Sequence, residues 1–560
     1  MNLYYFSTSI LEIMNYKNLF LANAVILLPQ LALAQSTELK ALYQKTYGET
    51  TPRTVSDKVP NILFITSDQH HWMAMGYNDP KCKTPNLDKL AQHGMIFDRA
   101  YSCNTVSTPS RASMITGRYP SQHGAYALGT KLLETELCIG DILNECGYET
   151  ALVGKAHFQP LYGTAEFPSC EAYPILQDFD FWRNYHGPFY GFSHVELSRN
   201  HADEAHVGQH YGIWLQDHVG DKWKDWFRVP TGNAPKGQSG AWKIPQEYHT
   251  DAWIAERCNA LLDQYKKGDK PFMLWASFFD PHNPYLVPEP WASMYNPDDM
   301  DLPETLRDDI SDMPLHYRIT RQENPDKSVW AEGEPSYPVH GILHHKWSEK
   351  SIKRNQAIYY GMVSMMDHYI GKILDHLEEN GQLDNTLIIF TTDHGGFNGH
   401  HGLTGKGVFD YEDDVKIPFI ASLKGKIPKG KRSDALISLV DIAPTILNMV
   451  GTQIPRCMTG VDQTEVLLGK KMEIRDHVLV ENRFQMTKFY VCTYIDKNYK
   501  LAYDMNSDEG ELFDLKNDPN EMVNHWVDPA YKEIKASLLL KALQARMKAE
   551  PVLMPRTAGA

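Results

Sequence analysis

Five short apolar runs alternate along the chain with segments of helical pattern, and this alternation constrains the fold more than any other feature. The runs are rich in Ile, Leu, Val, Phe and Thr and occupy residues 61–66, 149–153, 271–279, 386–391 and 417–422. Strands that alternate with helices pair in parallel, because each crossover returns the chain to the same edge of the sheet. The sequence therefore predicts an α/β fold in which a large, mostly parallel sheet is sandwiched by helices.

One helix is predicted with particular clarity. Between residues 358 and 377, apolar side chains recur every three or four positions, and Asn380-Gly381 supplies a C-terminal stop. By contrast, residues 160–250 are rich in aromatics, His and Gly without clear periodicity. We expect this region to form long loops over an edge of the sheet.

The pattern changes after about residue 455. Short strands are predicted at 490–494, 500–503 and 511–518, followed by a charged helix at 531–549. We therefore expect a main domain over residues 59–455 and a smaller α+β subdomain, with a short antiparallel sheet, over residues 456–550.

The N-terminus has the pattern of an export signal. Lys17 precedes an apolar run over 19–28, and Ala32-Leu33-Ala34 fits the small-x-small cleavage rule. We predict a signal peptide over 1–34 and a polar leader over 35–58, so the mature protein would be periplasmic or secreted. No other run approaches the ~20 apolar residues that span a bilayer, so no membrane span is expected.

Charge and cysteine content narrow the possible functions. The net charge is -15, with 70 acidic against 55 basic residues, whereas a nucleic-acid-binding protein needs a basic face. A small anionic ligand remains possible, because a few cations can focus positive potential in a cleft. The eight cysteines form no CxxC pair, and ordinary buried thiols are expected for most of them.

Polar, reactive residues follow four of the predicted strands. Strand 61–66 leads to Asp68 and Gln69, and strand 386–391 leads to Asp393 and His394. The two other strands lead to Lys155 with His157 and to His282. Ligands of open α/β sheets bind beyond the carboxyl ends of the strands, so these side chains are expected to form one site.

A further segment predicts an anion-binding helix terminus. Pro109 suits the first position of a helix, which places Ser107 just before the N-terminus, where free N–H groups attract an oxyanion. Arg111 adds a cation one turn into that helix. A Ser-Thr cap on an ordinary helix would explain the hydroxyl residues but not the arginine.

From Ser107 to Arg111 the segment resembles the signature of the type I, formylglycine-dependent sulfatases of the alkaline phosphatase superfamily, in the Ser form found in bacteria. Other parts of the chain are also similar to this family, and the resemblance covers roughly residues 59 to 525. The similar segments are Thr116-Gly117-Arg118, residues 61–69 and 84–90, Asp393-His394-Gly395, His401-Gly402 with Lys406, and residues 511–519.

The resemblance implies a sulfuric ester hydrolase. A maturase would oxidise Ser107 to formylglycine (3-oxoalanine), whose hydrate attacks sulfur with one oxygen and expels sulfate with the other. Ca²⁺ would be held by Asp68, Gln69, Ser107, Asp393 and His394, with Mg²⁺ or Mn²⁺ left open by the imidazole. Arg111 would orient the diol, and Lys155 and Lys406 would neutralise the sulfate. His157 would be the base that triggers sulfate release, and His282 the acid that protonates the leaving oxygen.

The sequence leaves two other functions open. A phosphodiesterase or phosphonate monoester hydrolase could use the same fold, and an inactive glycan-binding descendant would be expected to lack Ser107, Arg111 or a ligand aspartate. The expected substrate is a sulfated polysaccharide or its oligosaccharides, either ulvan or another algal glycan, or a glycosaminoglycan. Aromatic residues in 179–199 and 223–242 could stack on sugar rings or form a structural cluster, and the sequence leaves both open.

Overall fold

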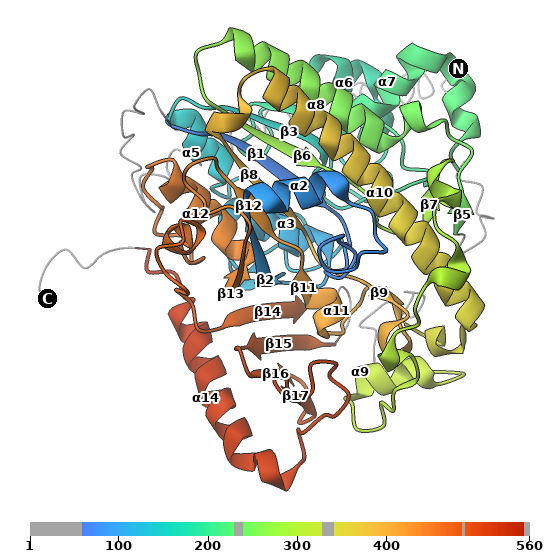
Figure 1. Ribbon diagram of the computed structural model, residues 1–560, viewed down its shortest axis with the longest axis vertical. Helices are drawn as coiled ribbons and strands as arrows, with labels where there is room; N and C mark the ends of the chain where they lie inside the picture. Colours follow the sequence, from blue (N-terminus) through green and yellow to red (C-terminus); the bar gives the residue numbers. More distant parts are fainter. Residues whose placement is uncertain (1–58, 229–238, 327–340, 484–487, 554–560) are drawn as a thin grey trace, which may run out of the picture.

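A twisted sheet of nine strands forms the centre of the computed structural model, which describes residues 59–228, 239–326, 341–483 and 488–553 (Figure 1). The strand order is β11-β2-β12-β8-β1-β6-β3-β4, and β13 pairs with β2. Only β11 and β12 run antiparallel to their neighbours, which confirms the mostly parallel sheet. The strands are β1 Asn61–Ser67, β2 Met95–Tyr101, β3 Glu149–Lys155, β4 His194–Ser198, β6 Phe272–Ser277, β8 Thr386–Thr392, β11 Lys416–Ile417, β12 Ile420–Ser422 and β13 Lys431–Ser438.

Helices cover both faces of this sheet because its central strands are apolar on both sides. In β1, Leu63 and Ile65 pack into one buried cluster, and Ile62 and Phe64 pack into another. The first cluster includes side chains of α2 Pro85–His93, α8 Thr250–Lys267 and α10 Glu349–Glu379. The second includes α3 Ser107–Thr116, α5 Ile139–Glu145 and α12 Ile442–Met449.

The helix predicted around residues 358–377 is α10, which crosses one face of the sheet in Figure 1. It begins where the Ser348 hydroxyl accepts a hydrogen bond from the backbone N–H of Ser351, at 3.2 Å. It ends at Asn380, followed by Gly381 at φ 73°. The prediction is confirmed, and the helix begins nine residues earlier than the apolar stripe because its first turns are largely polar.

The expectation of long loops over residues 160–250 is wrong in part. This region contains α6 Phe179–Asn184, β4 and α7 Gln209–Val219, and β4 pairs with β3 to extend the main sheet. The five residues of β4 alternate polar and apolar side chains too briefly to show a period. Pairing with β3 therefore decides the conformation there.

The run predicted as one strand at 417–422 is divided into β11 and β12. Pro418 lies between them and has no N–H to donate to the sheet, while its carbonyl accepts a hydrogen bond from Thr391 Oγ1 at 2.9 Å. Both pieces pair with β2, so the chain stays in the sheet across the break.

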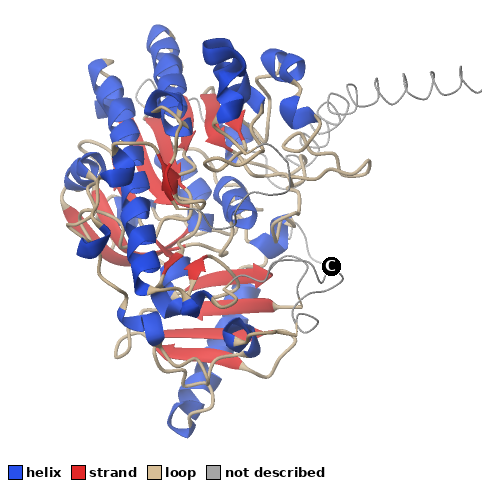
Figure 2. Cartoon of the chain, turned by 90° about the vertical axis from the view of Figure 1, so that its right-hand side faces the viewer, coloured by secondary structure: helices blue, strands red, loops and turns tan. Residues whose placement is uncertain are grey.

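A second, antiparallel sheet lies beside the first near the C-terminus (Figure 2). Its order is β14-β15-β16-β17, and the predicted strands and terminal helix are confirmed, with β14 added. The division of the chain at residue 455 stays a prediction. The elements are β14 Val478–Arg483, β15 Tyr490–Ile495, β16 Tyr499–Asp504, β17 Gly510–Asp514 and α14 Lys532–Lys548.

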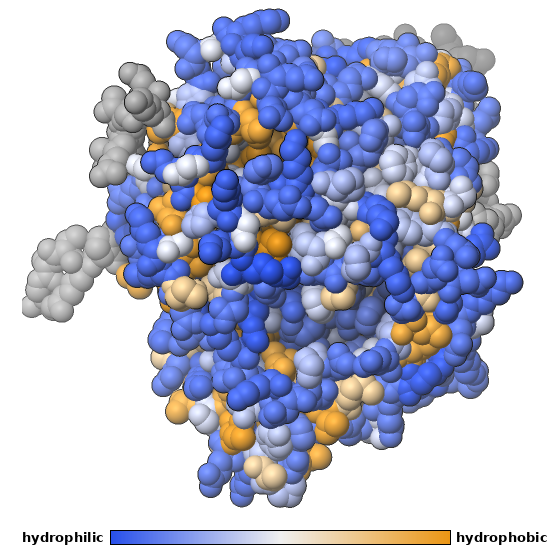
Figure 3. All heavy atoms as spheres, viewed as in Figure 1, coloured by the Kyte–Doolittle hydropathy of each residue, from blue (hydrophilic) through white to orange (hydrophobic). Residues whose placement is uncertain are grey.

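The surface in Figure 3 is mostly hydrophilic, with apolar side chains in small separate groups. Within the described ranges, no helix combines the length and apolar character needed to cross a membrane. The eight cysteines all lie in the described ranges and form no disulfide there, and seven of them are buried, as expected. The predicted signal peptide and leader, residues 1–58, lie outside the described residues.

Candidate active site

The four strands that were expected to deliver reactive side chains are consecutive neighbours in the sheet, in the order β8-β1-β6-β3. All four run parallel, so their carboxyl ends meet at one edge. Asp393, Asp68, His282 and Lys155 lie at these four ends, and all are buried. The predicted convergence of strand ends is therefore confirmed as geometry.

The helix α3 begins at Ser107, two residues before the predicted start at Pro109, and Ser107 lies inside this cluster, fully buried. Its Oγ is 3.5 Å from Asp68 Oδ1, 3.3 Å from His394 Nε2 and 3.3 Å from Lys155 Nζ. The unpaired N–H groups of the helix N-terminus add positive potential at the same point. An oxygen at this position therefore faces a cation, an imidazole and a carboxylate together.

Arg111 connects α3 to three strand ends and has no solvent exposure. Its Nε donates to Asp393 Oδ2 at 2.8 Å, and its Nη1 donates to Ser277 Oγ at 2.7 Å and to the Lys155 carbonyl at 3.1 Å. Its Nη2 donates to the Ser67 carbonyl at 3.4 Å. Every arm of the guanidinium is engaged, so Arg111 holds the helix against the sheet in one orientation.

Three of the predicted metal ligands form a compact donor set. Ligand atoms of Asp68, Asp393 and His394 all lie within 4.8 Å of one another. His394 Nδ1 donates to the Gly395 carbonyl at 2.8 Å, which leaves the Nε2 lone pair directed at the site. Gln69 has φ 55°, and its Oε1 is buried without a hydrogen-bond partner. A buried carboxylate pair with an unpartnered carbonyl oxygen fits a hard divalent cation.

Burial and mutual attraction set the protonation of the cluster. Burial alone would raise the pKa of Asp68, but the positive charges of Lys155 and Arg111 hold this pKa well below its usual value. Burial lowers the pKa of Lys155 to about 7, although Asp68 opposes the shift. Burial also lowers the pKa of His394 to about 4, so this imidazole is neutral and able to bind a cation.

Lys406 reaches the cluster from the opposite side, on the segment after β8. Its Nζ donates to His394 Nε2 at 3.0 Å and to His282 Nε2 at 2.9 Å. Burial, together with the charge of Lys406, holds the pKa of His282 well below its usual value. His282 is therefore neutral, with its Nδ1 hydrogen-bonded to the Asn283 carbonyl and its Nε2 accepting from Lys406.

His201 was missed by the sequence interpretation. Its Nε2 accepts a hydrogen bond from Lys155 at 2.8 Å, and its ring stacks on His282 with centroids 3.9 Å apart. On the other side of the His201 ring, Nδ1 donates to Glu204 Oε2 at 3.0 Å, which fixes the orientation of the imidazole. His201 follows β4, so the rule that predicted the other strand ends would have found it had β4 been recognised.

His157 lies in the wall of a cavity next to the cluster. Its backbone is left-handed, with φ 58°, and its N–H donates to Glu171 Oε2 at 3.1 Å. Burial and the neighbouring charges of Arg199 and Lys155 hold the pKa of His157 well below its usual value. Its Nδ1 has no hydrogen-bond partner. A neutral imidazole of this kind can accept a proton.

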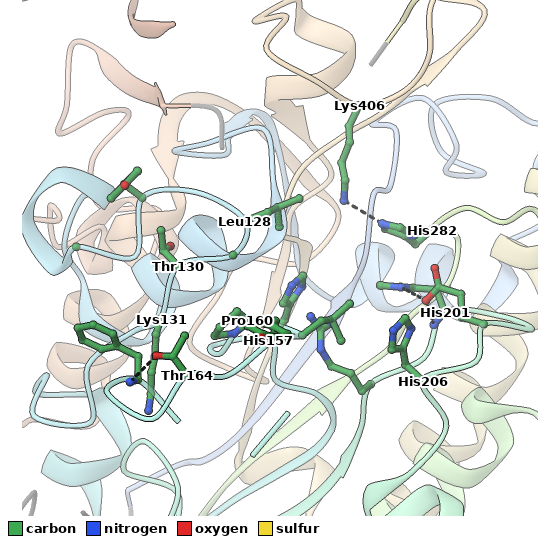
Figure 4. A pocket seen from close by; sticks show the side chains of 18 of the residues that line it. Leu128, Thr130, Lys131, His157, Pro160, Thr164, His201, His206, His282 and Lys406 are labelled. Atoms are coloured by element: carbon green, nitrogen blue, oxygen red, sulfur yellow. Dashed lines mark hydrogen bonds and ion pairs between the residues drawn. The ribbon is translucent and has the colours of Figure 1, made fainter. Parts of the chain in front are cut away.

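The cavity has a volume of about 940 Å³ and opens beside Lys406, His282 and His201 (Figure 4). In Figure 4, Thr130, Lys131 and Thr164 lie across it from these residues. Its aromatic lining comes from Tyr126, Tyr162 and Phe167. The tryptophans at 223, 226 and 242 are buried in the core. In the described part of 223–242 these aromatic residues therefore form a structural cluster and do not line the cavity.

The C-terminal sheet contacts two loops of the site. Asn482 of β14 donates through Nδ2 to Thr105 Oγ1 at 2.8 Å and to Asp410 Oδ1 at 3.1 Å. The N–H of Glu481 donates to the Cys103 carbonyl at 2.9 Å. One strand of the second sheet therefore holds both the segment that enters α3 and the loop that carries Lys406.

Comparison with known proteins identifies the family of this chain. The sulfatase family model matches residues 60–452, across every strand end described above. The chain belongs to the sulfatase family. A model described as N-sulphoglucosamine sulphohydrolase, C-terminal, matches residues 399–548, which include the antiparallel sheet of this sulfatase.

Individual relatives agree. The arylsulfatase of Clostridium perfringens is 30% identical over 509 residues, covering 87% of this chain and 95% of that protein. The N-acetylglucosamine-6-O-sulfatase of Bacteroides thetaiotaomicron is 26% identical, covering 89% of this chain and 88% of that one. A solved phosphonate monoester hydrolase from Silicibacter pomeroyi shares the fold, with TM-score 0.71, 24% identity, and coverage of 88% of this chain and 96% of that chain. The sulfatase described here is thus an enzyme that hydrolyses sulfate esters on an alkaline phosphatase-like fold.

Proposed function

We propose that this sulfatase is an exported, formylglycine-dependent enzyme that removes sulfate esters from sulfated oligosaccharides. The observation that carries the proposal is the position of Ser107. Its Oγ contacts Asp68, His394 and Lys155 at the positive end of a helix. A serine hydroxyl is a weak nucleophile unless a base activates it, whereas the hydrate of formylglycine supplies both an attacking oxygen and a route for sulfate release.

The cation of the site would be held by Asp68, Gln69, Asp393 and His394, together with the modified Ser107. The unpartnered Gln69 Oε1 and the inward-facing His394 Nε2 support this donor set. Ca²⁺ suits the oxygen-rich part of the set, and Mg²⁺ or Mn²⁺ suits the imidazole. The cation would polarise the sulfate oxygens.

The chain's own cations would bind and orient the sulfate. Lys155 and Lys406 approach the Ser107 region from two sides and can donate to different sulfate oxygens. Arg111 is already fully engaged with the sheet, so its role would be to fix the position of α3 and of Asp393.

Two histidines would move protons. Negative charge from a bound sulfate favours the protonated form of His282, which could then protonate the departing sugar oxygen. His157 is neutral and has an unpartnered Nδ1, so it would accept the proton whose loss releases sulfate. A maturase acting on Ser107 and a periplasmic or secreted location complete the proposal.

The size and the aromatic lining of the cavity support a sulfated sugar as substrate. About 940 Å³ lies beside the reacting groups, with Tyr126, Tyr162 and Phe167 in its wall. The relative from Bacteroides thetaiotaomicron acts on a sulfated amino sugar by its name. An algal glycan such as ulvan and a glycosaminoglycan are both included in the proposal.

Intact mass measurement tests the central point. Protein produced together with a Ser-type maturase should be lighter by one pair of hydrogen atoms, located at Ser107 by peptide mapping, and should hydrolyse an aryl sulfate. The matched control, Ser107→Ala, should fold equally well and be inactive. Full activity from unmodified serine, or a strong preference for a phosphonate monoester over the sulfate, would refute the proposal.

A further inference from the structure

Arg199 lies in the cavity wall just after β4 and is 3% exposed. Within the described part of the chain its guanidinium donates no hydrogen bond, and Nε is a buried donor without a partner. A buried N–H donor without an acceptor is costly, and the Nη groups of the same guanidinium also donate to no protein acceptor in the described residues, so the whole fork can donate to a group that enters the cavity. Arg199 is one of the residues that line the cavity beside His157, His201 and Lys406.

The carboxylate nearest to Arg199 is already occupied by the backbone. Glu171 accepts hydrogen bonds from the N–H groups of His157 at 3.1 Å, Phe158 at 2.9 Å and Gln159 at 3.1 Å. Its Oε2 is 3.4 Å from Arg199 Nε, which is an ion pair but not a hydrogen bond. Glu171 therefore balances the charge of Arg199 while leaving its donors free.

Other cations near the cavity differ in this respect. All arms of Arg111 are engaged with the strand ends. Lys131 Nζ contacts Glu134 at 2.6 Å and donates to the Pro168 carbonyl at 2.5 Å. Arg199 thus combines a balanced charge with an unused planar fork, which is the arrangement that binds two oxygens of one anion.

We propose that Arg199 binds a second anionic group of the substrate, a carboxylate or a further sulfate, on the sugar that enters the cavity. The inference rests on the proposed function and narrows its substrate to a sulfated sugar with two anionic groups. Two residues after Arg199, His201 contacts Lys155 and stacks on His282, so one short segment links the second anion site to the reacting one. The substrate would be a multiply sulfated or uronate-containing oligosaccharide.

Steady-state kinetics of Arg199→Lys and Arg199→Gln test the inference, with Lys131→Gln as the matched control. Substrates are an aryl sulfate, a monosulfated neutral sugar, the same sugar with a second sulfate, and a sulfated disaccharide that contains a uronate. Both Arg199 variants should lower kcat/KM about 10- to 100-fold on a doubly anionic substrate, mainly through KM. Arg199→Lys keeps the charge beside His157 and should stay within about 2-fold of wild type on the aryl sulfate and the monosulfated sugar, and Lys131→Gln should do so on every substrate. The doubly anionic substrate that shows the larger loss in kcat/KM identifies the second anion as sulfate or carboxylate.

Equal losses on singly and doubly charged substrates would overturn the inference, because Arg199 would then act on the reacting sulfate or on the fold. The inference would also be overturned if the wild-type enzyme showed no preference for substrates that carry the second anion. Arg199→Lys keeps a positive charge beside Glu171, so its melting temperature should match wild type and the test does not depend on the glutamine variant. Failure of the proposed function would look different, since the matured wild-type enzyme would not hydrolyse the aryl sulfate at all.

Discussion

Asn482 offers a test of how the second sheet supports the active site, because one amide group holds two site loops. Its Nδ2 donates to Thr105 Oγ1 and to Asp410 Oδ1, and both Asn482 and Asp410 are buried. Asn482→Ala removes two hydrogen bonds, one of them to a carboxylate. We expect a loss of about 2–3 kcal/mol in the free energy of unfolding at pH 7, with a smaller dependence on pH than in the aspartate variant described next.

Asn482→Asp keeps the shape of the side chain but places a carboxyl about 3 Å from that of Asp410. Two full charges there would repel by about 5 kcal/mol at an effective dielectric constant of about 20. One carboxyl will therefore retain a proton, which at pH 7 costs about 4 kcal/mol for a group whose ordinary pKa is about 3.9. Its folded pKa is raised, so stability is lost as pH rises above the unfolded pKa, by about 1.4 kcal/mol per pH unit.

The two variants should consequently exchange rank with pH. At pH 7 the aspartate variant should be the less stable by about 1–2 kcal/mol, and at pH 5 it should equal or exceed the alanine variant. Urea unfolding followed by tryptophan fluorescence, each variant compared with wild type at the same pH, measures this. Turnover of an aryl sulfate should fall in both, since the loops of Ser107 and Lys406 lose a shared anchor. Identical, pH-independent deficits would refute the reasoning.

Two further predictions concern the reacting groups. Exchange into EDTA should abolish turnover and lower the melting temperature of the wild-type enzyme, because a cation bound only by the native state stabilises it; in Asp393→Asn the melting temperature should no longer respond to the chelator. Unchanged activity after chelation would argue against the cation site. His282→Ala should lose about 100-fold or more in kcat/KM on a sugar sulfate but less than about 10-fold on an aryl sulfate, whose phenolate leaves without proton assistance. Equal losses on the two would assign the acid elsewhere.

The sequence predicted those strands whose side chains are apolar on both faces. β1 and β8 are continuous apolar runs, so their ends, and with them Asp68 and Asp393, could be located. β2 was not predicted, because Asp98 and Arg99 interrupt its apolar pattern at half-buried positions. Its pairing with β12 and β13 supplies what its own residues do not.

The candidate site shows the same limit. Ser107, Lys155 and Lys406 were found because motif and strand end coincide. His201 and Arg199 depend on β4, and their function depends on contacts with residues far apart in the sequence, such as Glu171. Long-range packing decides which wall of the cavity a loop forms, and this packing cannot be predicted from the residues of the loop alone.

The burial of Ser107 limits the period during which another enzyme can reach this residue. The segment that enters α3 is fastened by β14, which lies 377 residues further along the chain, as Thr105 and Asn482 show. At about 5–20 residues per second, the ribosome needs roughly 20 to 75 seconds to synthesise that interval. Under the proposed function, an enzyme that oxidises Ser107 would have to reach it while residues 103–107 can still enter another active site. Under the proposed function, the last strands to be made would close that period, so faster synthesis or faster docking of the second sheet should yield more unmodified, folded protein.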